Sequence, residues 1–299
     1  MANSAIQFLD PQLVSRLANM ELRARLVVEG FITGLHRSPY HGFSVEFAEH
    51  RQYMPGDAIR YVDWKIYGRT DRYYIKQFEE ETNLKATIIL DTSRSMGYAS
   101  EGNITKLQYG TYLAAALSYM MVRQQDAVGL ATFDEEMRSY LPPHATRGYL
   151  RQLLAHLQQV APSGKTGAGR AMHQAADRMR RRGLVIVISD LLDEPAQVVG
   201  ALKHFRHKKN EVIVMHVLDP MERSFAFGSD AVFVDAETAE RITTQPWQIA
   251  ASYHEAMRQF LETYKRECRE HAIDYVLMDT TTPFDIALTG YLAKRERIY

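Results

Sequence analysis

Residues 84–97 read LKATIILDTSRSMG, and this stretch is the clearest indication of the fold. The run ATIIL at 86–90 is apolar and rich in β-branched side chains, which favours a buried β-strand. Asp91 follows this run directly, and Ser93 and Ser95 lie on the turn after it. The sequence therefore predicts a buried strand that ends in a carboxylate and two hydroxyl groups.

Other segments along the chain have the same strand-like pattern. Together with the first, the predicted strands are 86–90, 127–133, 137–141, 184–189, 212–218 and 275–278. Amphipathic helical patterns separate most of them, and the clearest runs from Lys106 to Gln124 with its apolar residues on one face. Apolar strands that alternate with helices indicate a mainly parallel sheet with both faces covered. We therefore predict an α/β fold with a doubly wound, six-stranded sheet.

The regular alternation of strand and helix patterns begins only at residue 84, and the residues before it differ. Residues 11–35 have apolar positions at helical spacing, and 40–81 are rich in Tyr, Arg, Asp and Gly with shorter apolar segments. These features predict a small N-terminal lobe of mixed structure over 1–83 and an α/β domain over 84–299. Within that domain, 224–246 alternates apolar residues with turn residues, which predicts a β-hairpin insertion.

Composition and charge narrow the classes of function. Lys plus Arg and Asp plus Glu number 36 each among 299 residues, so no overall field attracts nucleic acid or an anionic membrane. The apolar runs are far shorter than the roughly 20 residues that span a bilayer, and the opening MANSAIQFLDPQL has no secretory signal pattern. We expect a cytoplasmic protein. The single Cys268 lies on a helical apolar stripe, so we expect a small buried thiol.

Most of the predicted strands are followed within one residue by an aspartate. These residues are Asp91, Asp134, Asp190, Asp219 and Asp279. Ligands of open parallel sheets bind beyond the carboxyl ends of the strands, where strand order reverses. Carboxylates gathered there suit a hard divalent cation. Aspartate also caps helices that follow strands, and this alternative stays open for each of the five.

Asp91 differs from the other four because Ser93 and Ser95 share its turn. The three side chains supply oxygen donors without histidine or cysteine, a set that Mg²⁺ or Mn²⁺ accepts and that zinc and copper do not prefer. Two neutral hydroxyls leave a bound cation with open positions for water or for an acidic side chain from elsewhere. We therefore predict a magnesium or manganese site at this turn.

The pattern D-x-S-x-S over 91–95 resembles the metal-ion-dependent adhesion site of von Willebrand factor A domains. In that family, a threonine from a second loop and an aspartate after the fourth strand complete the site, and this chain offers Thr166 and Asp190 in that order. The resemblance implies that the metal ligands are Asp91, Ser93, Ser95, Thr166 and Asp190. Many family members have glycine where this chain has Arg94. Two alternatives stay open for this residue: it contacts an acidic partner, or it is a surface arginine without a role.

The string EFAEHRQYMPGDAIRYVDWKIYGRTDRYYIKQFEEET precedes the first predicted strand and resembles the bacterial domain of unknown function 58. Members of that family end in a von Willebrand factor A-like domain and are often encoded beside MoxR-type AAA+ ATPases. The resemblance implies a non-enzymatic adaptor for such an ATPase or its client, in complex assembly or metal insertion. In PGDAIRYVDW we predict a structural clasp held by pairing of arginine with carboxylate. The residues of this clasp are Asp57, Arg60, Asp63 and Trp64.

An enzymatic alternative also stays open, namely a Mg²⁺-dependent phosphatase or phosphotransferase with Asp91 as the nucleophile. Haloacid-dehalogenase-type enzymes have a second aspartate two residues later, whereas this chain has Ser93. The SGKT at 163–166 lacks the first glycine and the preceding strand of a P-loop. The histidines show no catalytic spacing, and we interpret KHFRHKKN at 203–210 as a solvated basic helix end.

Overall fold

The six predicted strands form one sheet. The computed structural model describes residues 10–35, 50–52, 67–69, 71–76, 84–179, 182–227, 230–235 and 240–298. The strands of the sheet are β3 (Lys85–Asp91), β4 (Ala127–Phe133), β5 (Met137–His144), β6 (Leu184–Ser189), β7 (Glu211–Leu218) and β10 (Asp274–Asp279). Their order is β10-β7-β6-β3-β4-β5, and every neighbouring pair is parallel except β4 with β5. The predicted fold class, a doubly wound and mainly parallel α/β sheet, is confirmed.

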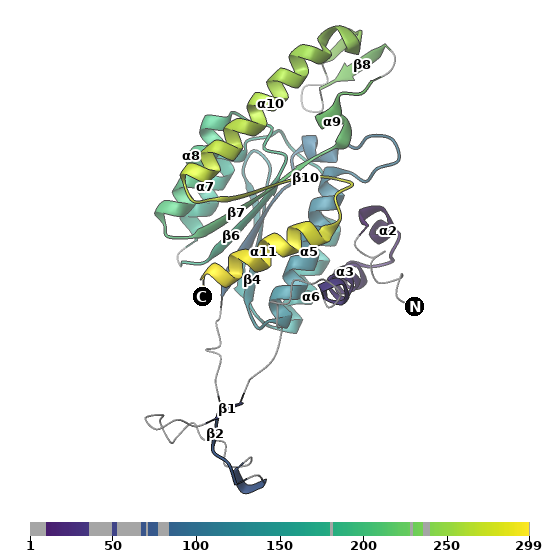
Figure 1. The fold of residues 1–299 in the computed structure, drawn as a ribbon. Helices are drawn as coiled ribbons and strands as arrows, with labels where there is room; N and C mark the ends of the chain where they lie inside the picture. Colours follow the sequence, from purple (N-terminus) through teal and green to yellow (C-terminus); the bar gives the residue numbers. More distant parts are fainter. Residues whose placement is uncertain are drawn as a thin grey trace.

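Helices cover both faces of this sheet (Figure 1). One face is covered by α3 (Met20–Leu35), α5 (Lys106–Arg123), α6 (Arg147–Gln159) and α11 (Phe284–Ile298), and the other by α7 (Ala168–Arg178), α8 (Pro195–His207) and α10 (Pro246–Glu270). Side chains alternate along each strand, so that Ile88 and Leu90 of β3 join the first core and Ile89 joins the second. Two hydrophobic cores therefore enclose the sheet.

Helix α5 lies at the centre of the first core. Thr105 Oγ1 accepts a hydrogen bond from Gln108 N, and the Gln108 side chain accepts one from Thr105 N, which together cap the first turn. The sequence predicts one apolar face on this helix, but nearly all of its residues are buried, because α3, α6 and α11 pack against it as well as the sheet. The helix thereby carries Lys106 into the interior.

The two N-terminal helices also contribute to this core. α2 (Pro11–Ser15) and α3 pack against α5, and the Arg23 guanidinium lies 4.7 Å from the centre of the Tyr112 ring. These helices, which the sequence analysis assigns to the N-terminal lobe, thus pack with the α/β domain because their apolar side chains cover α5. β1 (His50–Gln52) and β2 (Tyr74–Lys76) form a separate antiparallel pair. The predicted clasp residues Asp57, Arg60, Asp63 and Trp64 lie outside the described residues.

The predicted insertion is a β-hairpin. β8 (Ala231–Val234) and β9 (Arg241–Thr244) pair antiparallel after the short helix α9 (Pro220–Ser224). They lie beside the start of α10 and away from the main sheet (Figure 1). The Phe225 ring stacks on Tyr253 of α10 at a centroid distance of 4.1 Å, which attaches the base of the hairpin to that helix.

Cys268 is buried in the second core with Tyr264, as the helical stripe predicts. Burial raises the pKa of its thiol to about 12. Because the thiolate is the reactive form of cysteine, this side chain serves as a small core residue.

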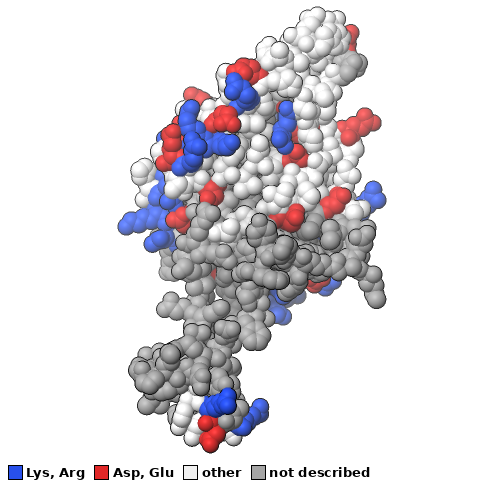
Figure 2. All heavy atoms as spheres, viewed as in Figure 1, with Lys and Arg blue, Asp and Glu red and all other residues white. Residues whose placement is uncertain are grey.

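Charged side chains of both signs are interspersed on the face of the molecule seen in Figure 2. This distribution agrees with the equal numbers of acidic and basic residues. Among the described helices, none combines the length and the hydropathy that crossing a bilayer requires.

Candidate functional site

The predicted site lies at the point where strand order reverses. β3 and β6 are neighbours, and the chain leaves β3 for β4 on one side and β6 for β7 on the other. Asp91 ends β3 and Asp190 follows β6, so the two carboxylates lie at the same edge of the sheet. Such switch points are the usual ligand sites of open parallel sheets.

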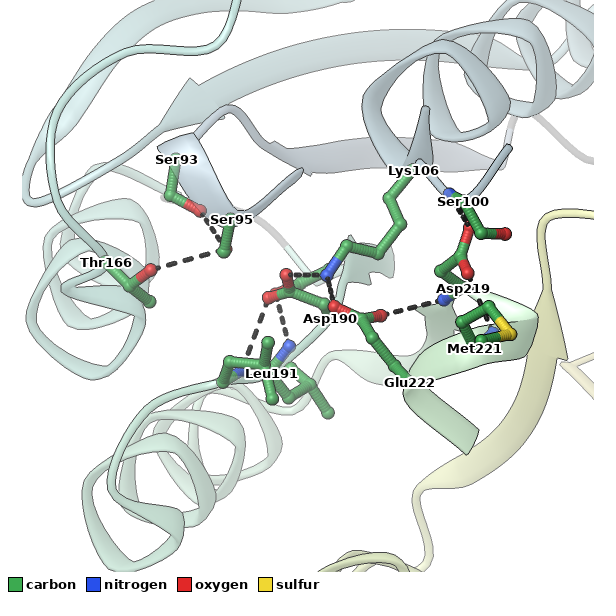
Figure 3. A network of polar contacts seen from close by, with 12 residues as sticks. Ser93, Ser95, Ser100, Lys106, Thr166, Asp190, Leu191, Asp219, Met221 and Glu222 are labelled. Atoms are coloured by element: carbon green, nitrogen blue, oxygen red, sulfur yellow. Dashed lines mark hydrogen bonds and ion pairs between the residues drawn. The ribbon is translucent and has the colours of Figure 1, made fainter. Parts of the chain in front are cut away.

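Three hydroxyl groups from two loops meet at this edge. Ser93 lies directly before the 3₁₀ turn η2 (Arg94–Gly97), and Ser95 lies within it. The Oγ atoms of these two serines are 3.0 Å apart. Thr166, on the loop before α7, places Oγ1 3.5 Å from Ser95 Oγ (Figure 3). The fold thus brings together the three hydroxyls that the sequence analysis selected.

The Asp91 carboxylate is fully buried, and both of its oxygens accept hydrogen bonds. Oδ1 accepts from Ser93 N at 2.9 Å, and Oδ2 accepts from Ser189 Oγ at 2.6 Å. Burial, followed by the charge of Asp190, raises the pKa of Asp91 to about 7 despite these bonds. Because desolvation disfavours the ionised carboxylate here, a cation placed beside it would have a large stabilising effect on that form.

Asp190 has a cationic partner that the sequence analysis does not identify. Lys106 Nζ lies 2.8 Å from Asp190 Oδ2, and both side chains are fully buried. Although burial opposes ionisation, the Lys106 ammonium holds the pKa of Asp190 below its ordinary value. In the sequence, Lys106 is one polar residue at the start of a predicted helix, where lysine is ordinarily solvated. Its burial is visible only once the helix is placed.

Lys106 also contacts a second carboxylate, Glu222 of α9, at 2.5 Å. Burial disfavours the ammonium, but the two carboxylates raise the pKa of Lys106 above its ordinary value. Glu222 further accepts a hydrogen bond from Asp219 N, and Asp219 accepts one from Ser100 N (Figure 3). This network joins the end of β6, the start of α5 and helix α9.

His216 of β7 positions the backbone at Asp190. Its Nε2 lies 2.8 Å from the Asp190 carbonyl oxygen, and its Nδ1 lies 2.7 Å from the Tyr275 hydroxyl. Because a carbonyl oxygen can only accept, Nε2 carries the hydrogen and Nδ1 accepts from Tyr275. Burial lowers the pKa of His216 to about 4, which keeps the ring neutral around pH 7.

The other aspartates that follow strands hold turns and loops, and among them Asp219 caps a helix, as the capping alternative predicts. These residues are Asp134, Asp219 and Asp279. Asp219 forms a capping box with Glu222 at the start of α9. Asp279 accepts a hydrogen bond from Thr281 N and pairs with Arg223 at 2.7 Å. The five aspartates thus divide into two at the switch point and three that hold turns and neighbouring loops.

Asp134 holds the loop that carries Thr166. Its carboxylate accepts a hydrogen bond from Ser163 Oγ at 3.0 Å. Gly164 packs directly on this carboxylate with a φ of +63°, and an added Cβ would lie 2.6 Å from Asp134 Oδ2. The position therefore requires glycine both for its backbone conformation and for space.

Replacing Gly164 by alanine is expected to destabilise the protein by about 2–3 kcal/mol, because strain at positive φ adds to the clash with Asp134. Gly102→Ala is the matched control, since Gly102 has a φ of +79° and nothing within 4 Å of its Cβ position. The control is expected to lose about 1–2 kcal/mol from backbone strain alone. Denaturant unfolding followed by circular dichroism measures both, and equal losses would contradict a role for the Asp134 contact.

The donor set and the charge of the site fit a hard divalent cation. Two oxygen ligands at a right angle, each about 2.1 Å from Mg²⁺, lie about 3 Å apart. The Ser93 and Ser95 hydroxyl oxygens have this spacing. Lys106 pairs with the carboxylates of Asp190 and Glu222, and the Asp91 carboxylate interacts with that of Asp190, so these four side chains carry an excess of two negative charges when all are ionised. A divalent cation matches that excess.

Arg94 lies between two of the candidate ligands and is exposed. Among the described residues, no hydrogen bond or ion pair engages its side chain. An exposed guanidinium at this place suits contact with an acidic group of a partner.

Known proteins resemble most of this chain. Over 237 residues it is 26% identical to the uncharacterised protein Rv1480 of Mycobacterium tuberculosis, covering 77% of this chain and 72% of that protein. It is similar to the solved structure of the conserved hypothetical protein BatB from Bacteroides thetaiotaomicron, at 18% identity and a TM-score of 0.47, covering 72% and 99% of the two chains. An aerotolerance-related membrane protein from Bacteroides fragilis matches at 20% identity and a TM-score of 0.49, covering 71% and 99%. The family described as protein of unknown function DUF58 matches residues 49–265, more than half of the chain, and this protein belongs to that family.

Proposed function

We propose that this protein is a non-enzymatic protein-interaction module that depends on a divalent metal ion. One observation carries the proposal: the hydroxyls of Ser93, Ser95 and Thr166 converge from two loops at the switch point of the sheet. The buried carboxylates of Asp91 and Asp190 lie at the same edge. This set of hard oxygens without a soft ligand suits Mg²⁺ or Mn²⁺.

Each residue has a role in holding the ion rather than in chemistry on a substrate. The three hydroxyls would bind the cation, and Asp91 and Asp190 would anchor it directly or through water. When bound, the ion supplies an electrophilic position open to an acidic side chain of a partner. Lys106 keeps Asp190 ionised and in place, since it lies 2.8 Å from that carboxylate and is itself fully buried.

The partner in this proposal is a MoxR-type AAA+ ATPase or its client, with this protein as an adaptor in complex assembly or metal insertion. Support comes from the resemblance of the segment before β3 to a family whose members are often encoded beside such ATPases. The exposed Arg94 would add attraction to an acidic partner surface around the ion.

The surroundings of Asp91 disfavour the alternative role as a phosphoryl-accepting nucleophile. A nucleophilic carboxylate must present an oxygen to a phosphoryl group with room for in-line attack, whereas a small ion needs only one further lone pair on an oxygen that already accepts a hydrogen bond. Both Asp91 oxygens accept hydrogen bonds within the protein, and the side chain has no exposed surface. Ser93 also stands where haloacid-dehalogenase-type enzymes have their second aspartate. These features support binding over catalysis.

Direct titration of Mn²⁺ into the full chain, after dialysis against EDTA, tests the metal site. We expect one equivalent to bind, and Thr166→Val to weaken binding at least tenfold because it removes one ligand oxygen. Thr111→Val is the matched control, since the Thr111 hydroxyl donates to Leu107 O inside α5, away from the site. Failure of the wild type to bind Mn²⁺, or equal binding by Thr166→Val, would contradict the site.

Capture of the purified ATPase on the immobilised protein tests the partner. Retention is expected with Mn²⁺ and is expected to be lost with EDTA. Metal binding without retention would remove the ATPase from the proposal and leave the metal site standing.

A further inference from the structure

Two histidines from neighbouring helices face each other on the second helical layer. Helices α7 and α8 pack side by side (Figure 1). His173 of α7 and His204 of α8 have their Nδ1 atoms 3.0 Å apart, with ring centroids separated by 5.2 Å. From the sequence, His204 is expected to belong to a solvated basic helix end. The structure instead pairs it with a second imidazole at a defined distance.

This nitrogen spacing is compatible with the binding of a single transition-metal ion. Two nitrogen ligands that are each about 2.1 Å from one ion lie about 3.0 Å apart at a right angle and about 3.4 Å apart at the tetrahedral angle of zinc, and a spacing of about 3.0 Å also fits an N–H···N hydrogen bond. Without an ion, one Nδ1 of the pair must carry a hydrogen and the other must accept it. With an ion, both Nδ1 lone pairs point at the metal and each ring carries its hydrogen on Nε2. We propose that His173 and His204 chelate a borderline divalent cation such as Zn²⁺, Ni²⁺ or Cu²⁺.

A carboxylate beside His204 supports this assignment independently. Asp177 lies one helical turn after His173, and its Oδ1 is 3.7 Å from His204 Nε2. Histidines that bind metals usually have the second ring nitrogen directed at a carboxylate, which favours the tautomer whose other nitrogen is free to bind the ion. Lys208 Nζ lies 3.2 Å from the same Asp177 oxygen and donates to Ala176 O at 2.8 Å. Lys208 thus pairs with this exposed carboxylate on the same side as His204.

The two helices that carry the pair are closely packed. A Cβ added at Gly169 of α7 would lie 2.7 Å from Gln197 Cβ of α8, so the two helices approach closely at their starts. Ala171, Ala175 and Leu202 are buried between these helices and the sheet. Because the helices are fixed by this packing, chelation needs only side-chain adjustment, which lowers the entropic cost of binding.

The chemistry of this pair separates it from the hydroxyl site. Imidazole nitrogens favour zinc, nickel and copper, whereas the hydroxyl and carboxylate oxygens at Asp91 favour magnesium and manganese. Another cluster of possible ligands consists of Glu267, Glu270 and His271 on and just after α10. There, Lys203 and Arg266 lie within 3.4 Å of the Glu267 oxygens, so that carboxylate already has cationic partners. The histidine pair is therefore the stronger candidate.

Calorimetric titration of Zn²⁺ and Ni²⁺ into the EDTA-dialysed full chain tests the proposal. We expect one equivalent to bind to the wild type, and His173→Gln and His204→Gln each to weaken binding at least tenfold. Both histidines lie on the surface layer, so both variants are expected to fold, which circular dichroism checks. Cu²⁺ bound to the wild type is expected to show electron paramagnetic resonance couplings to two imidazole nitrogens.

Three matched variants locate the ion. His207→Gln changes another histidine of α8 and is expected to bind Zn²⁺ like the wild type. His271→Gln changes the competing cluster, and Thr166→Val changes the hydroxyl site; both are also expected to leave Zn²⁺ binding unchanged. Absence of binding by the wild type, equal binding by the His173 and His204 variants, or loss on His271→Gln would each overturn the proposal. These outcomes are independent of whether Mn²⁺ binds at Asp91.

Discussion

Replacing Lys106 by methionine is expected to destabilise the protein by about 3–5 kcal/mol, because removal of one partner leaves buried charges without compensation. Lys106 has no exposed surface and lies 2.8 Å from Asp190 and 2.5 Å from Glu222. Methionine has a similar length and preserves most of the apolar packing, so the loss in the free energy of unfolding is due to the missing ammonium. Urea unfolding in EDTA, followed by circular dichroism, measures the free energy of unfolding.

Lys203→Met is the matched control for this experiment. Lys203 pairs with Glu267 at 3.4 Å, but both side chains are partly exposed. Ion pairs in contact with water contribute about 0–1 kcal/mol to the free energy of unfolding, so the control variant is expected to lose little stability. Adding Glu222→Gln to Lys106→Met is expected to recover part of the loss, because it removes one of the two uncompensated carboxylates. Similar losses for the two lysine variants would contradict the buried network as a stabilising unit.

Mg²⁺ or Mn²⁺ is expected to raise the melting temperature of the wild type, and Asp91→Ala is expected to abolish this rise. A ligand at a hundredfold excess over its dissociation constant stabilises the native state by about 2.7 kcal/mol. For a protein of this size, that corresponds to a shift of roughly 4 °C. Asp91 is chosen because it is fully buried beside Ser93, and burial disfavours its ionised form, which a nearby cation would stabilise. Thermal scans with and without the metal measure the shift.

Asp279→Ala serves as the control for this second prediction. Asp279 also ends a strand at the carboxyl edge of the sheet. It forms an ion pair with Arg223 and accepts a hydrogen bond from Thr281 N, away from the candidate metal ligands. The metal-induced shift is expected to persist in this variant, whatever its own stability. A wild type without any shift would contradict the metal site, and a shift retained by Asp91→Ala would place the ion elsewhere.

Much of the fold follows from local patterns in the sequence. ATIIL at 86–90 predicts β3, and LVIVIS at 184–189 predicts β6, because runs of apolar residues of this length suit strands covered on both faces. The convergence of Asp91 and Asp190 also follows, since the carboxyl ends of parallel strands share one edge. The hydroxyl of Thr166 joins them because its loop opens the next helix at that same edge.

Other features could not be predicted because they depend on contacts distant in sequence. Lys106 is separated by 84 residues from Asp190 and by 116 from Glu222, and no periodicity relates them. The apolar stripe on α5 reports contact with the sheet, but the burial of its other sides depends on where α3 and α11 pack. The pairing of His173 with His204 likewise depends on the rotation of α7 against α8.

The sequence by itself therefore determined the alternation of strands and helices, the edge of the sheet where the candidate site lies, and the hydroxyls and carboxylates on its turns. The local hydrophobic periodicity indicates which side chains are buried, and the parallel direction of the strands indicates which strand ends lie together. Only the tertiary structure decided that a buried lysine neutralises Asp190 and that two histidines share one face of the helical layer. The physical reason is that an isolated charge is favourable in water and costly in the core, so its role depends on partners that only packing brings near.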